Sequence, residues 1–208
     1  MATFLRPLSY RYQWLYDAIS RTAALSVGGE ERFRHLALRG LTLTPDSQIL
    51  DLCCGSGQTT RFLTAYSHHV TGLDASPLSI RRAQRNVPEA DFVEGWAENM
   101  PFEDSRFDVV HTSAAMHEMQ PDQRQQIFQE AFRVLKPQGI FAMVDFHRPR
   151  NPLFWPGLAA FLWLFETETA WQMLATDIPE QLSQVGFAVD GPNLHAGGSL
   201  QVIQARRP

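Results

Sequence analysis

The sequence predicts an α/β fold: a mostly parallel sheet of seven strands with helices on both faces. Short apolar runs alternate with helical patterns along the chain, which is typical of parallel strands joined by crossover helices. The last connection, GPNLHAGGS, has no helical pattern, so we expect the final two strands to pair as an antiparallel hairpin at the sheet edge. With 208 residues, 44% of them hydrophobic, the chain is long enough for one well-packed domain.

Each expected element follows from its local pattern. Ser76 followed by Pro77 predicts a helix start, because Ser is a favoured N-cap and Pro is tolerated at the first helical position. Residues 121–135 place apolar side chains at helical spacing, and KPQG after them is expected to form a turn. The expected strands are 47–54, 69–76, ADFVEGWA, 106–115, 139–149 and two near the C-terminal end; the expected helices include about 58–65, 76–86, 121–135, PEQLSQVG, EERFRHLALR up to Gly40, and one carrying Tyr12, Leu15, Tyr16 and Ile19.

Charge and the N-terminal sequence narrow the classes of function. The formal net charge is −4, and no basic stripe of the kind that neutralises phosphates is present, which argues against a nucleic-acid partner. The segment MATFLRPLSYRYQW has no apolar stretch of the length that a signal peptide needs, so we expect a cytoplasmic protein.

The two cysteines, Cys53 and Cys54, are adjacent. A disulfide between neighbours is strained, and the chain has no spaced Cys or His pair of the kind that binds zinc. We therefore expect no metal, and we interpret both thiols as packing groups at the end of a buried strand, with one facing the following loop.

The stretch DLCCGSGQTT (51–60) predicts a ligand site. Asp51 ends a strand, and the turn through Gly55 and Gly57 into a helix brings bare backbone amides to the carboxyl edge of the sheet. Thr60 stands where a dinucleotide fingerprint would have its third glycine, which weakens an NAD interpretation. Asp74 ends the second strand, where a carboxylate can accept hydrogen bonds from both ribose hydroxyls. A ribose without a pyrophosphate indicates a nucleoside ligand.

Four motifs carry a family resemblance. DLCCGSGQTT, TGLDASPLSIRRAQ, FVEGWAENMPFEDSRFDVV and VLKPQGIFAMVD resemble the successive motifs of class I S-adenosylmethionine-dependent methyltransferases of the methyltransferase 11 type, over about residues 45–146. The resemblance implies a Rossmann-like sheet and S-adenosyl-L-methionine as cofactor. The cofactor-binding residues that it implies are Asp51, Cys53, Gly55, Gly57, Asp74, Ala75, Leu78, Trp96, Ala97 and Thr112.

The resemblance also implies a role for several of these residues. Asp51 and the two glycines would line the methionine and ribose part, and Asp74 would hold the ribose hydroxyls. Ala75 and Leu78 would pack on the adenine, with Ala97 at its rim. Trp96 stands where many relatives have an acidic residue, so it would stack on the adenine or cover it; otherwise it is a partly buried packing residue.

Methyl transfer is an in-line displacement, so positioning is its main requirement. A base is needed only if the acceptor loses a proton. His117 and His147 follow strands at the ligand-binding edge and are candidates for that base; the alternative for each is a hydrogen-bonded structural histidine. His111 falls within a strand pattern and is expected in the core, whereas Glu118 and Asp145 are candidate polar liners of the site.

The segment PLFWPGLAAFLWLF (152–165) is uncharged and shorter than the roughly 20 residues of a bilayer span. Three interpretations remain open: a lid over a lipophilic acceptor, a peripheral membrane contact, or a buried core helix. Together with YRYQWLYDAIS, it gives a looser resemblance to quinone-biosynthesis C-methyltransferases. This implies a small lipophilic or aromatic acceptor.

We expect a single methyltransferase domain with four parts: an N-terminal helical cap (1–40), the cofactor-binding core (41–148), an apolar lid (149–175), and a C-terminal helix with strands (176–208). Two rival functions remain. One is a catalytically silent protein that binds S-adenosylmethionine as a partner or regulatory subunit. The other is a nicotinamide-dependent oxidoreductase.

Overall fold

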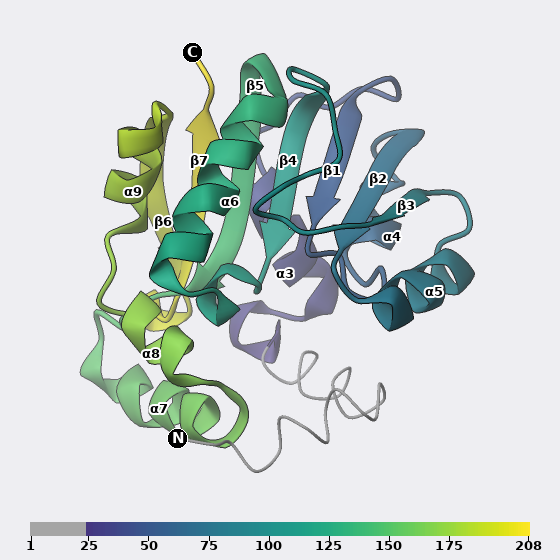
Figure 1. The fold of residues 1–208 in the computed structure, drawn as a ribbon. Coiled ribbons are helices and arrows are strands. Elements are labelled where there is room, and N and C mark those ends of the chain that lie inside the picture. The colour runs from purple at the N-terminus through teal and green to yellow at the C-terminus, as the bar shows by residue number, and fades with distance from the viewer. Residues whose placement is uncertain (1–23) are drawn as a thin grey trace.

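A computed structural model describes residues 24–208, which form a seven-stranded sheet with helices on both faces (Figure 1). The strand order is β3-β2-β1-β4-β5-β7-β6, and the pairings among β1 to β5 are parallel. This confirms the predicted fold class. The strands are β1 (Gln48–Leu52), β2 (His69–Asp74), β3 (Asp91–Glu94), β4 (Phe107–Ser113), β5 (Leu135–Phe146), β6 (Ala188–His195) and β7 (Leu200–Arg206).

Strand β7 runs antiparallel to both of its neighbours. We predicted one antiparallel pairing, between the last two strands at the edge of the sheet. The structure has this pairing, but the predicted number of antiparallel pairings was wrong. The short connection η5 (Ala196–Gly198) turns the chain back, so that β7 enters between β5 and β6 and the sheet has two antiparallel pairings. KPQG, expected as a turn, lies within β5, and Gln138 there has a left-handed φ of 68°.

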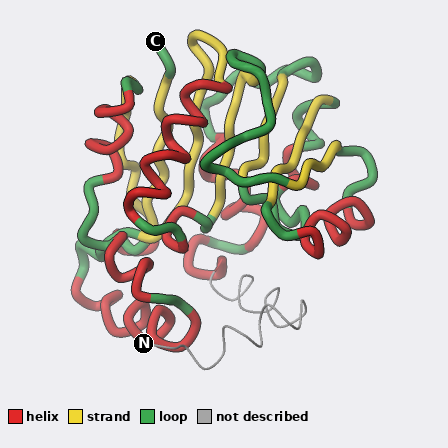
Figure 2. The backbone as a smooth tube through the Cα atoms, in the orientation of Figure 1, coloured by secondary structure: helices red, strands yellow, loops and turns green. Residues whose placement is uncertain are grey.

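The helices lie on both faces of the sheet, as Figure 2 shows. Residues of α6 and α9 pack with one core cluster, and residues of η1, α3, η2 and α4 pack with the other. Strand β5 serves both clusters, because Phe141 and Met143 point to one face and Ala142 and Val144 to the other. The helices are η1 (Leu25–Val27), α3 (Glu30–His35), η2 (Leu36–Leu38), α4 (Thr60–Leu63), α5 (Pro77–Asn86), η3 (Met116–Glu118), α6 (Pro121–Val134), η4 (Pro152–Phe154), α7 (Trp155–Phe165), α8 (Glu168–Met173) and α9 (Ile178–Val185).

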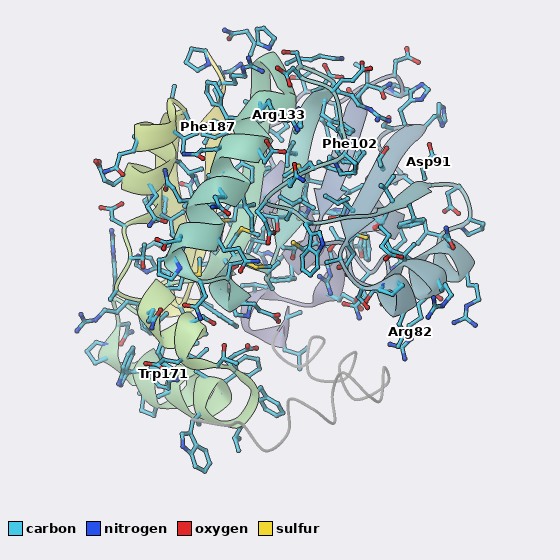
Figure 3. The ribbon with its side chains drawn as sticks, viewed as in Figure 1. Arg82, Asp91, Phe102, Arg133, Trp171 and Phe187 are labelled. Carbon is cyan, nitrogen blue, oxygen red and sulfur yellow. The ribbon has the colours of Figure 1, made fainter. Side chains whose placement is uncertain are left out.

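Aromatic side chains fill much of the α6 and α9 face (Figure 3). Phe187 contacts Phe132 with ring centroids 5.0 Å apart, and Phe102 contacts Phe107 at 5.1 Å. Arg133 of α6 donates to the carbonyl of Phe102 at 2.8 Å. These contacts fix the long loop between β3 and β4 against α6.

Helices α7 and α8 lie at the end of the sheet toward which the parallel strands point (Figure 1). In α7 only Leu162 is buried, so the interpretation of this segment as a buried core helix was wrong. The helix that we predicted around Tyr12, Leu15, Tyr16 and Ile19 lies outside the described residues. Within residues 24–208, none of the helices is long and apolar enough to cross a membrane.

Strand β2 packs so closely on its neighbours that position 72 has no room for a side chain. A Cβ on Gly72 would lie 2.6 Å from Cδ1 of Phe92 and 2.9 Å from Sγ of Cys54. Cys54 is therefore a packing residue beside β2 and β3, as expected from its place at the end of a buried strand.

We predict that Gly72→Ala lowers the free energy of unfolding by about 1–3 kcal/mol, the usual cost of overpacking. Gly157→Ala is the matched control, because a Cβ on Gly157 meets nothing within 4 Å and Ala favours a helix. Urea unfolding of both variants measures the difference. Equal stabilities would contradict the close packing at β2.

Candidate functional site

A cavity of about 270 Å³ opens where β1, β2 and β4 end. After β1 the chain continues to β2 and β3 on one side of the sheet, and β4 and β5 lie on the other side. The cavity therefore lies at the topological switch point, where open α/β sheets bind their ligands. It is lined by the turns that follow the three strands and by α3, α5 and η3, through Arg34, Asp51, Cys53, Cys54, Gly55, Ser56, Gln58, Thr59, Asp74, Ala75, Ser76, Ser79, Arg82, Ser113, Ala114, Ala115, Glu118 and Met119.

Asp74 joins two of these turns. Its Oδ2 accepts a hydrogen bond from the Gly55 amide at 2.9 Å, and its Oδ1 accepts one from the Ser76 amide at 2.9 Å. Burial raises the pKa of Asp74, and the two amide bonds oppose that rise. The carboxylate lies in the cavity lining, and each of its oxygens has a further lone pair for a ligand.

Asp51 is buried beneath the turn that follows β1. Its Oδ2 accepts a hydrogen bond from the Thr60 hydroxyl at 2.6 Å, and its Oδ1 lies 3.3 Å from Nδ1 of His111. Thr60, which stands where a third glycine would be, thus anchors the start of α4 to β1. His111 is fully buried, as expected for a core residue.

The turns after β1 and β4 both contain a left-handed residue other than glycine. Cys53 has a φ of 58° and Ala114 a φ of 52°, and both line the cavity. Such conformations are uncommon for residues with a side chain and gather at functional sites. Burial raises the pKa of both Cys53 and Cys54, so both thiols are protonated at neutral pH. The thiols therefore lack the thiolate form that acts as a nucleophile or metal ligand.

Arg34 is a cavity residue that the sequence analysis missed. It comes from α3, is buried, and donates to Oε1 of Gln58 at 2.8 Å and to Oγ1 of Thr59 at 3.1 Å. Its guanidinium brings a positive charge to the cavity wall. In EERFRH nothing distinguishes Arg34 from the exposed Arg32, so no sequence signal could have found it.

Five of the ten residues implied as cofactor contacts line the cavity: Asp51, Cys53, Gly55, Asp74 and Ala75. The other five, Gly57, Leu78, Trp96, Ala97 and Thr112, lie outside its lining.

These five residues pack elsewhere in the protein or are exposed to solvent. A Cβ on Gly57 would come within 3.1 Å of the Val87 side chain, so Gly57 lets the loop approach α5. Ala97 and Thr112 are buried. Trp96 is 63% exposed and Leu78 44%, so Trp96 is not the partly buried packing residue of the alternative interpretation, and its contact with the adenine stays a prediction.

His117 lies between two carboxylates. Its Nδ1 is 2.6 Å from Oδ1 of Asp145, and its Nε2 is 3.3 Å from Oε2 of Glu166, which follows α7. Burial opposes the charged imidazolium, but the two carboxylates outweigh it and hold the pKa of His117 well above its usual value. The ring does not line the cavity, and its environment is that of a hydrogen-bonded structural histidine.

The remaining candidate residues near this edge of the sheet differ in whether they line the cavity. Glu118 lines the cavity, as expected. Asp145 does not line it, because it is buried and accepts hydrogen bonds from the amides of Met116, His117 and Phe146. His147 also lies outside the lining, with Nδ1 2.9 Å from the Gly198 carbonyl oxygen.

One group of side chains in the described part of the chain brings possible cation ligands together. Nε2 of His117 and carboxylate oxygens of Glu118 and Glu166 lie within 4.8 Å of one another. The raised pKa of His117 favours its imidazolium form, which places a positive charge among these carboxylates. The expectation that the protein uses no metal therefore stays a prediction.

Comparison with known proteins agrees with this geometry. A family model described as a methyltransferase domain matches residues 49–139. An uncharacterised methyltransferase of Synechocystis sp. is 57% identical over 206 residues, which cover 99% of this chain and 97% of that protein. The 2-phytyl-1,4-naphtoquinone methyltransferase of Nostoc sp. is 31% identical over 163 residues, which cover 74% of this chain and 69% of the relative.

The fold has solved counterparts. The crystal structure of a methyltransferase from Aquifex aeolicus that depends on S-adenosylmethionine aligns with a TM-score of 0.65 at 16% identity, covering 86% of this chain and 92% of that one. With the family match and the two relatives, the chain belongs to the methyltransferases.

Proposed function

We propose that the cavity at the ends of β1, β2 and β4 binds S-adenosylmethionine, and that the protein transfers its methyl group to a small lipophilic or aromatic acceptor. The observation that carries this proposal is that Asp74 and Arg34 both line the same cavity. The cofactor needs a hydrogen-bond acceptor for its ribose hydroxyls and a positive charge for its carboxylate, and these two side chains supply them.

Asp74 is suited to the ribose because its position is fixed. Each carboxylate oxygen is already held by one backbone amide, so the group loses little freedom when a ligand binds. Two hydroxyls can then donate to its remaining lone pairs, and Ala75 beside it offers an apolar surface for the adenine.

Arg34 is suited to the methionyl carboxylate because a guanidinium binds a carboxylate through two parallel N–H bonds. Gln58 and Thr59 hold its side chain against the start of α4, and Oε1 of Glu30 lies 4.0 Å from its Nη2, so the guanidinium is oriented before the ligand arrives. Asp51 and Glu118, also in the lining, are acidic groups suited to the ammonium and sulfonium ends of the cofactor.

The methyl group leaves a sulfonium as the acceptor atom approaches in line with the breaking bond, so the contribution of the protein is mainly positioning. Because His117 is enclosed by Asp145 and Glu166, we propose that it fixes the chain after α7 and is not the base. The acceptor class is supported by the apolar segment η4–α7 and by the Nostoc relative, whose name refers to a phytyl naphthoquinone.

The direct test of this function combines titration with turnover. The wild-type protein should bind S-adenosylmethionine and S-adenosylhomocysteine, and it should methylate a quinol or phenol that carries an alkyl chain. Binding without turnover on any such acceptor would favour the rival function, a silent cofactor-binding partner. Binding of NADH in place of both would favour the oxidoreductase.

We predict that Asp74→Asn raises the dissociation constant for S-adenosylhomocysteine by about 5- to 150-fold, which corresponds to about 1–3 kcal/mol for hydrogen bonds to a charged group. Asp91→Asn, at an exposed position of β3, is the control and should bind like wild type. Calorimetric titration measures both. Unchanged affinity in a folded Asp74→Asn protein would remove Asp74 from the site.

Arg34→Met should lower the affinity for S-adenosylhomocysteine by at least about tenfold, because a hydrogen bond from a charged group is lost. It should have little effect on 5′-methylthioadenosine, which has the same nucleoside but no carboxylate. Arg32→Met, on the exposed side of α3, controls for the helix. If Arg34→Met lowers the affinity for both ligands equally, the role of Arg34 is to support the cavity wall and not to hold the carboxylate.

Glu166→Gln should lower the pKa of His117 and destabilise the protein in a pH-dependent way. The charged groups around His117 are Asp145, Glu118, Glu166 and, beyond Asp145, Arg124. Since the pKa of His117 is raised on folding, its stabilising contribution is fully present below the unfolded value of about 6.5 and is lost as the pH rises through the raised pKa.

The stability difference between wild type and Glu166→Gln should therefore be largest near pH 6 and shrink at higher pH. Thermal unfolding across this range, with NMR titration of His117, measures it. Glu168→Gln, at the exposed start of α8, is the control. A difference that stays constant with pH would contradict the ion pair.

A further inference from the structure

The segment η4–α7 exposes an apolar surface that the other described residues, 24–208, leave uncovered. We call it the α7 surface and define it as Leu153, Phe154, Trp155, Trp163 and Leu164, each of which is more than a third exposed. Leu153 is 81% exposed and Trp163 56%. A helix that is apolar on all sides normally lies in a protein core or a membrane, but only Leu162 of α7 is buried.

The base of the α7 surface is fixed to the hairpin between β6 and β7. The ring of Phe154 lies directly on Gly197, where a Cβ would collide with it, and a Cβ on Gly198 would lie 2.6 Å from the Arg150 amide nitrogen. Asn151 donates its amide to the Gly197 carbonyl at 3.2 Å. The two glycines therefore leave the space into which Phe154 and Arg150, at the start of the segment, pack.

The far end is fixed as well. Glu166 follows α7 and pairs with His117. At the start of α7, Trp155 contacts Trp171 of α8 with ring centroids 6.3 Å apart. The apolar side chains are thus displayed by a segment that is held at both ends. Such an arrangement is preorganised for binding, since little freedom is lost when the surface meets its partner.

The charge beside the surface favours an anionic partner. Between His147 and Phe165 the charged residues are Arg148 and Arg150, which are both exposed, and this stretch contains no acidic residue. Apolar and tryptophan side chains beside exposed arginines match the interface of a bilayer, where indole rings lie at the headgroup level and cations meet anionic lipids. A second copy of the chain would bring the same two exposed arginines to the contact.

We propose that the α7 surface docks the protein on a bilayer that contains anionic lipids. The apolar side chains enter the boundary between headgroups and acyl chains, and Arg148 and Arg150 lie at the headgroups. At 11 residues the helix is about 16 Å long, so it lies on the membrane and does not span it. This inference goes beyond methyl transfer, because it concerns where the protein works and not what it transfers.

Docking in this orientation would bring the site close to a dissolved lipophilic acceptor. Helix α8 packs against η3, which carries the cavity residue Glu118. Helix α7 lies at the end of the sheet where β1, β2 and β4 end (Figure 1), and the turns that follow these strands line the cavity. An acceptor with a long alkyl chain could keep that chain in the bilayer while its ring reaches the cavity.

The test is flotation of the purified full chain with two kinds of vesicle: phosphatidylcholine mixed with phosphatidylglycerol, and phosphatidylcholine alone. Wild type should float with the mixed vesicles, and its tryptophan emission should shift to the blue. Leu153→Ser with Trp163→Ser should lower the bound fraction by at least about tenfold, because apolar burial is lost. Arg148→Gln with Arg150→Gln should weaken binding to mixed vesicles only.

Trp96→Ser is the matched control, because it removes an exposed tryptophan outside the α7 surface and should leave vesicle binding unchanged. Affinity for S-adenosylhomocysteine verifies that the Leu153 and Trp163 variant is folded, so that failure of docking and failure of the proposed function are distinguished. The inference is overturned if wild type binds neither vesicle, or if the variant binds like wild type. A dimer in ultracentrifugation that the same substitutions dissociate would also overturn it and assign the surface to a second copy.

Discussion

The site depends on the carboxylate of Asp74, which ties together the turns that follow β1 and β2. Parallel strands end at one edge of a sheet and leave backbone amides there that need acceptors. Asp74 accepts from Gly55 and Ser76, and so it fixes the two turns at a separation that leaves a cavity. Burial makes its charge costly, and the two amides offset part of that cost.

The buried carboxylate of Asp145 plays a similar part for the turn that follows β4. Asp145, near the end of β5, accepts from the amides of Met116 and His117 and from the His117 ring, and it thereby shapes the turn that follows β4. His117 in turn pairs with Glu166, which follows the end of α7. The turn that follows β4 and the end of α7 therefore share one ion-pair network.

Local patterns predicted the elements of the fold and some of the site. The alternation of strands and helices, the Ser76 cap and the aspartates at strand ends follow from neighbours in sequence, and these predictions held. Arg34, the outward direction of Trp96 and the enclosure of His117 depend on which segments meet in space. The insertion of β7 beside β5 likewise depends on a tight turn at Gly197 and Gly198, whose positive φ angles no periodicity reveals.

The most direct test of the central claim is a crystal structure of the protein with S-adenosylhomocysteine. The account predicts one molecule per chain in the cavity, with its ribose hydroxyls on the Asp74 carboxylate and its amino-acid carboxylate on Arg34. A ligand bound elsewhere, or a ligand in the cavity whose ribose makes no contact with Asp74, would contradict it.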